Sequence, residues 1–383
     1  MRQSSVLGQL LKLTPRREFE ILAEQHHVGQ PFRKTTRWNQ FVVLLTAQLA
    51  GHSSLREIDH SGKALQPHLL RLGCKPLNRS TLGRLNSRQS PDLYRDLFQR
   101  LLSRCQEFAG QRKLPVNRKL ISLDSTLIHL CLKLFPWADC SAYKAGVKVH
   151  VGLDHASWLP EIVCITEGRR HDHQVLPQVK LIPGTVYIFD RGYCDYAWFD
   201  RLTKANCPFV TRAKFNMRYE AVKDRPLVPG SGVLADQNIH LTGVQGKKHT
   251  RQLRRIHYFD PGTQKDLVFI TNNLKWSAAT IAAIYKERWQ IELFFKWIKQ
   301  RAKIKRFVGN SMNAVMTQIW IALIAYLITA FVKLSRHLDH SLTQIFRLIR
   351  ATLFDHRDLW GVVIHATIPP QASSDLQLEL KLA

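Results

Sequence analysis

One segment of the chain combines a carboxylate, two cations and a phenol at spacings that place them on one side of a helix. Tyr285, Arg288, Glu292 and Lys299 fall within roughly 60° of one another at about 100° per residue. The neighbouring arc is apolar and predicts a buried face, formed by Ile284, Ile291, Phe294 and Ile298. A glutamate held in this way can ligate a hard divalent cation while its neighbours hold a phosphodiester. The simpler alternative is an exposed helix with ordinary ion pairs.

The elements before this helix read as an α/β sheet. Strands are predicted at 121–130, 147–154, 161–168, 185–193, 207–214 and 267–273, because these runs are β-branched or alternating and are bounded by Gly, Pro or charge. Helices are predicted near 175–180 and at 196–206. Residues 216–265 are rich in Gly, Pro and charge and form a β-rich insertion before the glutamate helix, which begins near Ser277.

Two further acids lie on the predicted strands. Asp124 lies within the first strand and Asp190 at the carboxyl end of the fourth. In such sheets the functional crevice opens near the ends of neighbouring central strands, so we expect both carboxylates and Glu292 to converge. A set of hard oxygen ligands suits Mg²⁺ or Mn²⁺ and has no soft donor that favours zinc. Two such ions about 4 Å apart would serve an in-line displacement at phosphorus.

The charge balance predicts a polyanionic partner. The chain has 56 Lys and Arg against 29 Asp and Glu, a formal charge of +27, and nucleic acid is the leading candidate. A membrane surface is the rival, because residues 314–332 carry no charge. Thr317, Gln318 and Thr329 interrupt that run, so we expect a core helix and no membrane partner. The amino terminus lacks a signal-peptide pattern, which favours the cytoplasm.

Three regions are expected along the chain. Residues 1–110 form an all-α amino-terminal domain, 119–335 the catalytic domain and 336–383 a helical carboxy-terminal region. Within the first, residues 69–86 have the outline of a helix-turn-helix, although short helical hairpins are common in all-α domains. The seven cysteines form no C-x-x-C pair, and reduced thiols are the expectation.

The Tyr-x2-Arg-x3-Glu-x6-Lys pattern resembles the signature of bacterial DDE transposases of the insertion-sequence-four family. It matches without a gap from Tyr285 to Lys299, and the family's Asp-Arg-Gly-Tyr strand end appears at 190–193. The first family aspartate maps on Asp124, in a less distinctive motif. The β-rich insertion also fits, and the resemblance covers about residues 120–333.

The resemblance implies a ribonuclease H-like core and cut-and-paste movement of an insertion sequence through nicked and hairpin-ended intermediates. Asp124, Asp190 and Glu292 would be the catalytic residues and would hold two Mg²⁺ or Mn²⁺ ions. The expected DNA contacts are Tyr285, Arg288, Trp289 and Lys299, with Trp289 stacking on a base near the cleaved end. The enzyme would act as a homodimer on paired element ends and on target DNA, at the bacterial nucleoid.

Several alternatives stay open at this point. The same fold could carry a structure-selective nuclease or resolvase, or a catalytically idle transposase-derived DNA-binding protein. Trp289 could instead be a core residue. The His171-Asp172-His173 segment could bind a transition metal, but a polar helix entry is the more common role of such a sequence. Lys148 could touch phosphate or be an ordinary surface lysine.

Overall fold

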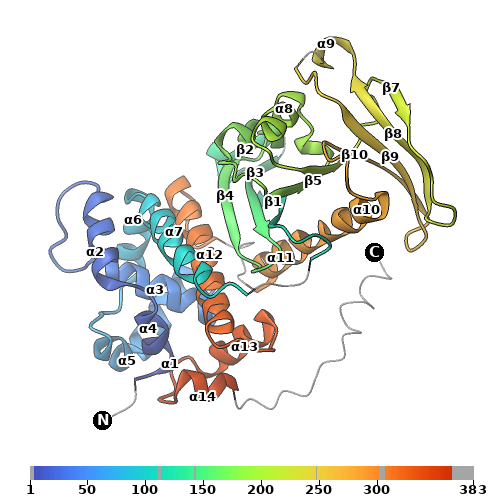
Figure 1. Ribbon diagram of the computed structural model, residues 1–383. Helices are drawn as coiled ribbons and strands as arrows, with labels where there is room; N and C mark the ends of the chain where they lie inside the picture. The colour runs from blue at the N-terminus through green and yellow to red at the C-terminus, as the bar shows by residue number, and fades with distance from the viewer. Residues whose placement is uncertain (1–3, 111–113, 142–143, 247, 302–306, 365–383) are drawn as a thin grey trace.

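The molecule consists of a helical bundle packed beside a mixed β-sheet (Figure 1). The computed structural model describes residues 4–110, 114–141, 144–246, 248–301 and 307–364. The remaining 365–383 of the predicted carboxy-terminal region therefore lie outside the described residues. The cysteines with described side chains are free thiols: Cys74, Cys105, Cys131, Cys164, Cys194 and Cys207.

The strands follow the predicted order with shifts at their ends, and the strand predicted at 185–193 is shorter because residues 191–193 form a 3-10 helix. They are β1 (Leu120–Leu130), β2 (Asp139–Ser141), β3 (Lys144–Asp154), β4 (Pro160–Glu167), β5 (Val186–Phe189), β6 (Phe209–Arg212), β7 (Tyr219–Asp224), β8 (Val233–Leu241), β9 (Leu253–Asp260) and β10 (Lys265–Thr271). Short 3-10 helices are η1 (Pro136–Ala138), η2 (Asp172–Gln178) and η3 (Arg191–Tyr193).

The helices fall into an amino-terminal and a carboxy-terminal set. The first set is α1 (Val6–Lys12), α2 (Arg16–Gln25), α3 (Arg37–Ala50), α4 (Leu55–Ala64), α5 (Gln66–Arg71), α6 (Arg79–Arg88) and α7 (Asp92–Gln106). After the first strands come α8 (Tyr196–Lys204), α9 (Gly243–Gly246), α10 (Ala278–Glu287) and α11 (Trp289–Gln300). The last are α12 (Met312–Leu334), α13 (Leu342–Thr352) and α14 (Leu359–Ile364).

One sheet contains the core strands and the insertion together. Strand β1 pairs parallel with β5, and β5 pairs parallel with β6. On one side β3 pairs antiparallel with β1 and β4 with β3. On the other side β10 pairs antiparallel with β6, followed by β9, β8 and β7. The predicted insertion at 216–265 therefore extends the sheet instead of forming a separate β unit.

Alternation along the strands decides which side chains meet the glutamate helix. Successive residues point to opposite faces, so Leu120, Ser122 and Asp124 share one face of β1. On that face Leu120 packs in a buried cluster with Ile281 and Ile284 of α10. The opposite face, with Leu123, packs against Trp198 and other residues of α8. The acid in β1 is thus aimed at α10 and α11.

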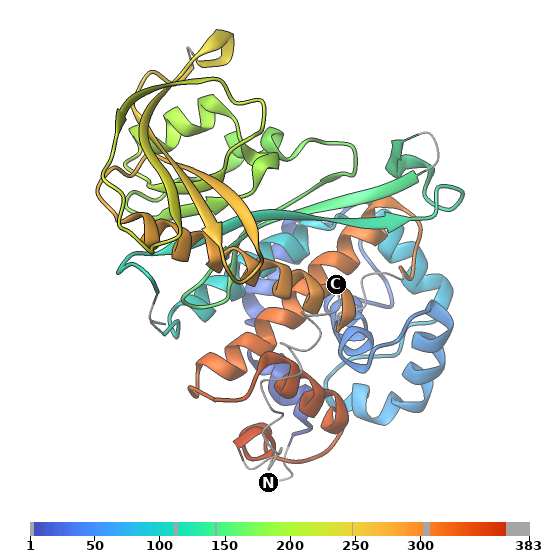
Figure 2. The ribbon, with the colours of Figure 1, turned by 90° about the vertical axis from the view of Figure 1, so that its right-hand side faces the viewer.

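The bundle is built from both ends of the chain. Helix α12 packs against α7, α3 and α6, and its Tyr326 ring lies 5.0 Å from Phe294 and 4.9 Å from Trp297 of α11. Figure 2 shows α11 lying between the sheet and the bundle. Although α12 is long and apolar enough to span a membrane, 83% of its most apolar window is buried inside the protein. The expected core helix is therefore present, largely covered by the amino-terminal helices.

The glutamate segment forms two helices where the sequence predicts one. Its start agrees, because Ser277 caps α10 through the Thr280 N–H. At Arg288, however, the N–H bonds to the Tyr285 carbonyl at 3.0 Å, and the Ile291 N–H bonds back to Arg288 at 3.2 Å. These three-residue spacings are the tighter 3-10 pattern and interrupt the α-helical ladder. The predicted apolar arc is still buried on both helices.

Candidate active site

Two acids from the neighbouring central strands β1 and β5 lie side by side. In the parallel β1–β5 pair Leu123 lies opposite Phe189, so Asp124 and Asp190 are the next residues along each strand. Both carboxylates remain partly accessible, with 22% and 35% of the side chains exposed. The register therefore brings the two aspartates side by side, as expected from the strand order.

Arg288 connects the first aspartate to the glutamate. Its Nη1 donates to Asp124 Oδ2 at 3.2 Å and its Nη2 to Glu292 Oε1 at 2.8 Å. The guanidinium fork can meet two carboxylates at once, and each contact is a charge-assisted hydrogen bond. The break between α10 and α11 thus places an arginine directly between two of the predicted site acids.

The second aspartate has its own partners. The Tyr285 hydroxyl donates to Asp190 Oδ1 at 3.3 Å, and Arg212 Nε donates to the same oxygen at 3.1 Å. The Tyr285 side chain is buried and its ring lies 5.0 Å from Phe269, which leaves little of it for a phosphate. Sequence reasoning missed Arg212. Its position at the carboxyl end of β6, beside β5, was the signal available.

The electrostatic environments of the two aspartates differ. Burial raises the pKa of Asp124 to about 6; the Ser125 N–H and Arg288 oppose this, and the nearby Glu292 and Asp190 carboxylates add to it. Burial also acts to raise the pKa of Asp190, but the Arg191 N–H and the guanidinium groups of Arg212 and Arg288 outweigh it and lower that pKa. The three acids therefore influence one another at close range.

The other predicted residues lie along α11. Trp289 opens the helix with 44% of its surface exposed, so the alternative of a core tryptophan is wrong. Lys299 lies seven residues after Glu292, on the same side of the helix and about 10 Å further along it. Both Glu292 and Lys299 are half-buried. The residues of the signature thus line one side of the broken helix.

The donor set has the chemistry expected for a hard cation, but the acids are not gathered into a cage. Among the residues that the structure describes, no group of three His, Cys, Asp or Glu side chains could enclose a metal ion. The Arg288 guanidinium lies between Asp124 and Glu292 and supplies the positive charge there. Carboxylate oxygens are still the ligands that Mg²⁺ and Mn²⁺ prefer, so the three acids fit such ions by type.

Three polar side chains, Ser122, His155 and Glu287, connect β1 to the end of α10 next to the helix break. Ser122 lies two residues before Asp124, and its hydroxyl is 2.7 Å from His155 Nε2. His155 Nδ1 lies 3.6 Å from the Glu287 carboxylate, at the end of α10. A serine, a histidine and a glutamate in this order could suggest a nucleophilic triad. Ser122 and His155 are almost fully buried, however, so the arrangement ties β1 to α10 and is closed to a substrate.

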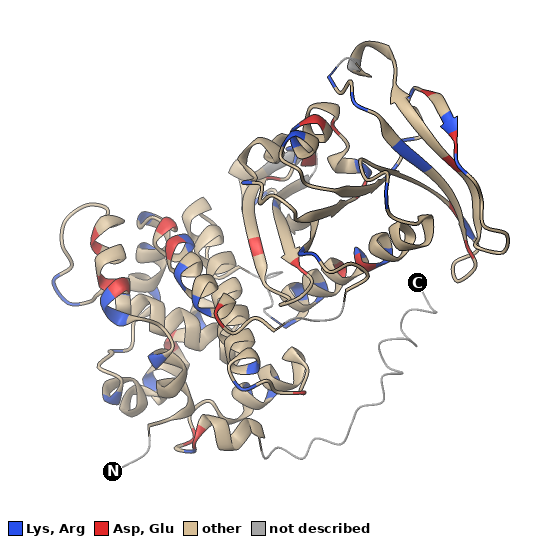
Figure 3. Ribbon diagram, in the orientation of Figure 1, with Lys and Arg blue, Asp and Glu red and all other residues tan. Residues whose placement is uncertain are grey.

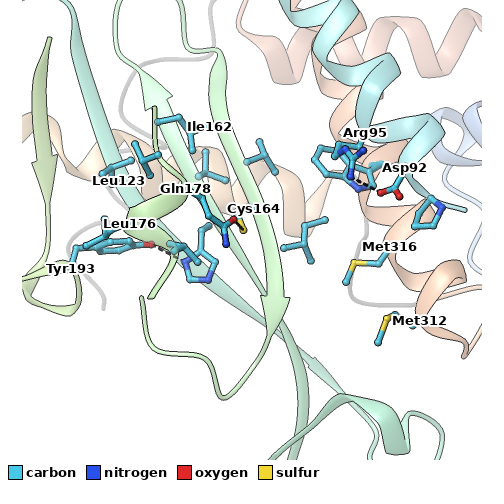
Figure 4. A pocket seen from close by; sticks show the side chains of 18 of the residues that line it. Asp92, Arg95, Leu123, Ile162, Cys164, Leu176, Gln178, Tyr193, Met312 and Met316 are labelled. Atoms are coloured by element: carbon cyan, nitrogen blue, oxygen red, sulfur yellow. Dashed lines mark hydrogen bonds and ion pairs between the residues drawn. The ribbon is translucent and has the colours of Figure 1, made fainter. Parts of the chain in front are cut away.

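A cavity of about 450 Å³ lies away from the acids, beside the edge strand β4. Figure 4 shows Cys164 of β4 and Tyr193 of η3 on one side, and the Asp92–Arg95 ion pair with the two bundle methionines, Met312 and Met316, on the other. Its walls are mostly apolar, and the site acids do not line it. The cavity is therefore separate from the candidate active site.

The His171-Asp172-His173 segment lies at the start of the 3-10 helix η2. His171 and His173 are exposed and stack at 5.7 Å, and Asp172 begins η2. Lys148 is not a free surface lysine, because its Nζ lies 3.2 Å from Asp172 and donates to the Arg170 carbonyl. The wider positive charge is spread over the bundle helices and the β7–β9 insertion (Figure 3).

Comparison with known proteins identifies the class. Residues 116–328 match the Transposase DDE domain family, and residues 2–75 match a separate family described as a domain of unknown function, DUF4372. The first match covers more than half of the chain. The chain therefore belongs to the DDE transposase family, as its resemblance to bacterial DDE transposases predicted.

The names of individual relatives agree with this family assignment. The chain is 34% identical to a protein assigned as transposase y4zB of Sinorhizobium fredii over 78% of this chain and 82% of that one. It is 31% identical to a protein assigned as the transposase of insertion sequence element IS5377 of Geobacillus stearothermophilus, covering 67% of each. A third relative, assigned to insertion sequence element IS4SA of Synechocystis, is 24% identical over 77% of this chain and 84% of its own length.

Proposed function

We propose that this transposase cleaves and joins DNA with a metal-dependent site formed by Asp124, Asp190 and Glu292. The observation that carries the proposal is the Arg288 bridge, which brings acids from β1 and α11 to one guanidinium at 3.2 and 2.8 Å. We assign the sheet to the ribonuclease H-like class on its strand order, β4-β3-β1-β5-β6. In this order β3 runs antiparallel to both β4 and β1, whereas β1, β5 and β6 run parallel to one another. Placement within the insertion-sequence-four group rests on the signature at Tyr285 to Lys299.

The three acids would hold two Mg²⁺ or Mn²⁺ ions, which when bound activate the attacking oxygen and stabilise the leaving one. Tyr285 and Arg212 hold the Asp190 carboxylate from two sides. Arg288 neutralises Asp124 and Glu292 and is the nearest cation for a phosphate beside them. Lys299, further along the same side of α11, orients the DNA backbone, and the exposed Trp289 stacks on a base.

The element moves by a cut-and-paste route with hairpin-ended intermediates, in the bacterial cytoplasm on nucleoid DNA. A homodimer would hold two element ends together. The bundle residues 1–110 would bind these ends, and the catalytic domain would span 119–335 with α12 docked into the bundle. A nuclease or resolvase on the same fold would cut DNA without joining it to a target.

The test uses DNA that carries the two ends of the mobile element as substrate. Asp124→Ala, Asp190→Ala and Glu292→Ala should each slow cleavage in Mg²⁺ by at least about 100-fold, while end binding stays within about threefold of the wild type. Strand-transfer products from the wild type separate a transposase from a nuclease. If any one variant cleaves at the wild-type rate, the site assignment is wrong at that residue.

A time course should separate the steps. We expect Lys299→Ala to slow hairpin formation and strand transfer more than end recognition, because its role is to position a phosphate. Nicked, hairpin and double-strand-broken products are measured for each variant. Uniform loss of every step, together with loss of folding, would contradict a positional role.

A further inference from the structure

A third aspartate, Asp172, contacts residues next to the two site aspartates. Asp172 opens η2, and its Oδ1 accepts a hydrogen bond from Ser125 Oγ at 2.8 Å and lies 3.2 Å from Lys148 Nζ. The Ser125 backbone N–H in turn donates to Asp124 Oδ1 at 2.8 Å. Ser125 is therefore held between two aspartates, with its side chain on Asp172 and its backbone on Asp124.

The other oxygen of Asp172 faces the turn that carries Asp190. A Cβ placed on Gly192, in η3, would lie only 2.7 Å from Asp172 Oδ2, closer than real Cβ contacts allow. Asp172 thus packs directly against the backbone two residues after Asp190. This close approach gives a physical reason for glycine at the third position of the Asp-Arg-Gly-Tyr sequence. Tyr193, next in the turn, contacts His150 through its hydroxyl at 3.1 Å.

We infer that Asp172 is a positioning residue for the transposase reaction, which fixes the supports of Asp124 and Asp190 relative to each other. The inference rests on the proposed function, in which those two aspartates hold the ions. One carboxylate contacts β1 through Ser125 and the turn η3 through Gly192, so it joins the two strand ends that must keep a fixed separation. Side chains behind metal ligands commonly tune metal affinity in this way.

One cation pairs with the Asp172 carboxylate. Burial lowers the pKa of His150 to about 4, so its imidazole is neutral at physiological pH and Lys148 is the cation facing Asp172. His171 and His173 stack on each other, and among the described residues no acid, histidine or cysteine group could enclose a metal at this segment. The contacts through which Asp172 acts are therefore those with Ser125 and Gly192.

The experiment compares full-length variants on terminal-repeat DNA under single-turnover conditions. Asp172→Ala should slow cleavage by about 10- to 100-fold and leave the Kd for end DNA unchanged. Asp172→Asn keeps an acceptor for Ser125 and should recover part of the rate. His171→Ala and His173→Ala, which change the two flanking exposed side chains, should cleave at the wild-type rate. Wild-type cleavage by Asp172→Ala, or equal loss in the flanking controls, would overturn the inference.

Two double variants test the route of the effect. Gly192→Ala should slow cleavage by displacing Asp172, and it should add no further loss in an Asp172→Ala background. Ser125→Ala combined with Asp172→Ala should likewise be no slower than the slower single variant. Additive losses in both pairs would show that Asp172 does not act through these residues and would contradict the inference.

Mn²⁺ binding, followed by electron paramagnetic resonance, separates this inference from the proposed function. If the wild type binds Mn²⁺ but does not cleave DNA, the proposed function fails. The inference is then still tested by comparing the Mn²⁺ affinities of Asp172→Ala and the wild type. Asp172→Ala should bind Mn²⁺ about 10-fold or more weakly than the wild type. Equal affinity in the two proteins would sink the inference, even where cleavage is active.

Discussion

The Arg288 guanidinium reaches from the break between α10 and α11 to 3.2 Å from the Asp124 carboxylate in β1. The two residues are 164 positions apart, yet this contact and the 2.8 Å contact to Glu292 define the candidate site. An arginine keeps its charge at any physiological pH, so it can donate to two partly buried carboxylates at the same time. The interruption of the helix at Arg288 therefore has a direct consequence for the site.

Removing this arginine should make the protein depend on divalent cations for stability. Without metal, Arg288→Ala leaves Asp124 and Glu292 without their shared cation, and we expect a loss of about 3 kcal/mol. Mn²⁺ should then raise the melting temperature of the variant more than that of the wild type, because the ion binds only the folded site. Thermal unfolding in EDTA and in Mn²⁺ measures both. Lys286→Ala, an exposed cation on α10, is the control, and an equal Mn²⁺ response in all three proteins would contradict the prediction.

The two tryptophans of α11 should behave differently. Trp297 is buried, 4.9 Å from Tyr326 and 5.2 Å from Phe346, so Trp297→Ala should cost about 3–5 kcal/mol. Trp289 is 44% exposed, so Trp289→Ala should change stability by no more than about 0.5 kcal/mol. If Trp289 stacks on a base, a contact of about 1–3 kcal/mol, its loss should slow the hairpin steps selectively.

Urea unfolding and the product time course distinguish these two outcomes. DNA that lacks the base at the stacked position should partly restore the hairpin rate of Trp289→Ala, because the unpairing cost is removed. A Trp289→Ala protein that is as destabilised as Trp297→Ala would show that Trp289 has a structural role.

Affinity for duplex DNA should depend strongly on salt. The formal charge of +27 provides many Lys and Arg for phosphate contacts, so log Kd should change linearly with log salt at about 0.9 per phosphate contacted. Fluorescence anisotropy at several salt concentrations gives the slope. Binding that is indifferent to salt would argue against a DNA partner and favour the membrane alternative for α12.

The buried histidine behind the site predicts loss of stability in acid. Burial lowers the pKa of His150 to about 4, with Lys148 and Arg170 acting in the same direction and Asp172 opposing them. The unfolded chain takes up this proton near pH 6.5 and the folded protein only near pH 4. The stabilisation is therefore complete above about pH 6.5 and is lost as the pH falls toward 4, a change of up to about 3 kcal/mol.

Urea unfolding at pH 7.5 and pH 4.5 tests this prediction. His150→Gln should reduce the difference between the two stabilities by about 2 kcal/mol relative to the wild type. His129→Gln, which changes an exposed histidine of the neighbouring strand β1, should leave the difference unaltered. The same reduction in both variants would mean that burial of His150 is not the cause.

Much of the local structure follows from the sequence because the relevant patterns repeat over a few residues. The period of two in β1 puts Asp124 on the face of Leu120, and the run from Val186 to Phe189 leaves Asp190 at its end. The apolar arc that includes Ile291 and Phe294 predicted the buried face of α11. These features need only neighbouring residues, and each is confirmed by the described structure.

The limits of local patterns appear where distant segments meet. Nothing between Tyr285 and Glu292 is Pro or Gly, so the sequence predicted a continuous helix and missed the break at Arg288. The docking of α12 against α7, and the extension of the sheet through β10, likewise depend on which apolar surfaces become neighbours. Patterns within one element do not contain that information.

The sequence by itself determined the residue types of the site, the elements that carry them and the family to which they belong. Only the tertiary structure decided that Arg288 lies between Asp124 and Glu292, that Arg212 shares Asp190 with Tyr285, and that Asp172 packs under Gly192. The physical reason is that side-chain contacts across such separations are fixed by strand register and helix packing, whereas periodicity along the chain fixes only which face each side chain takes.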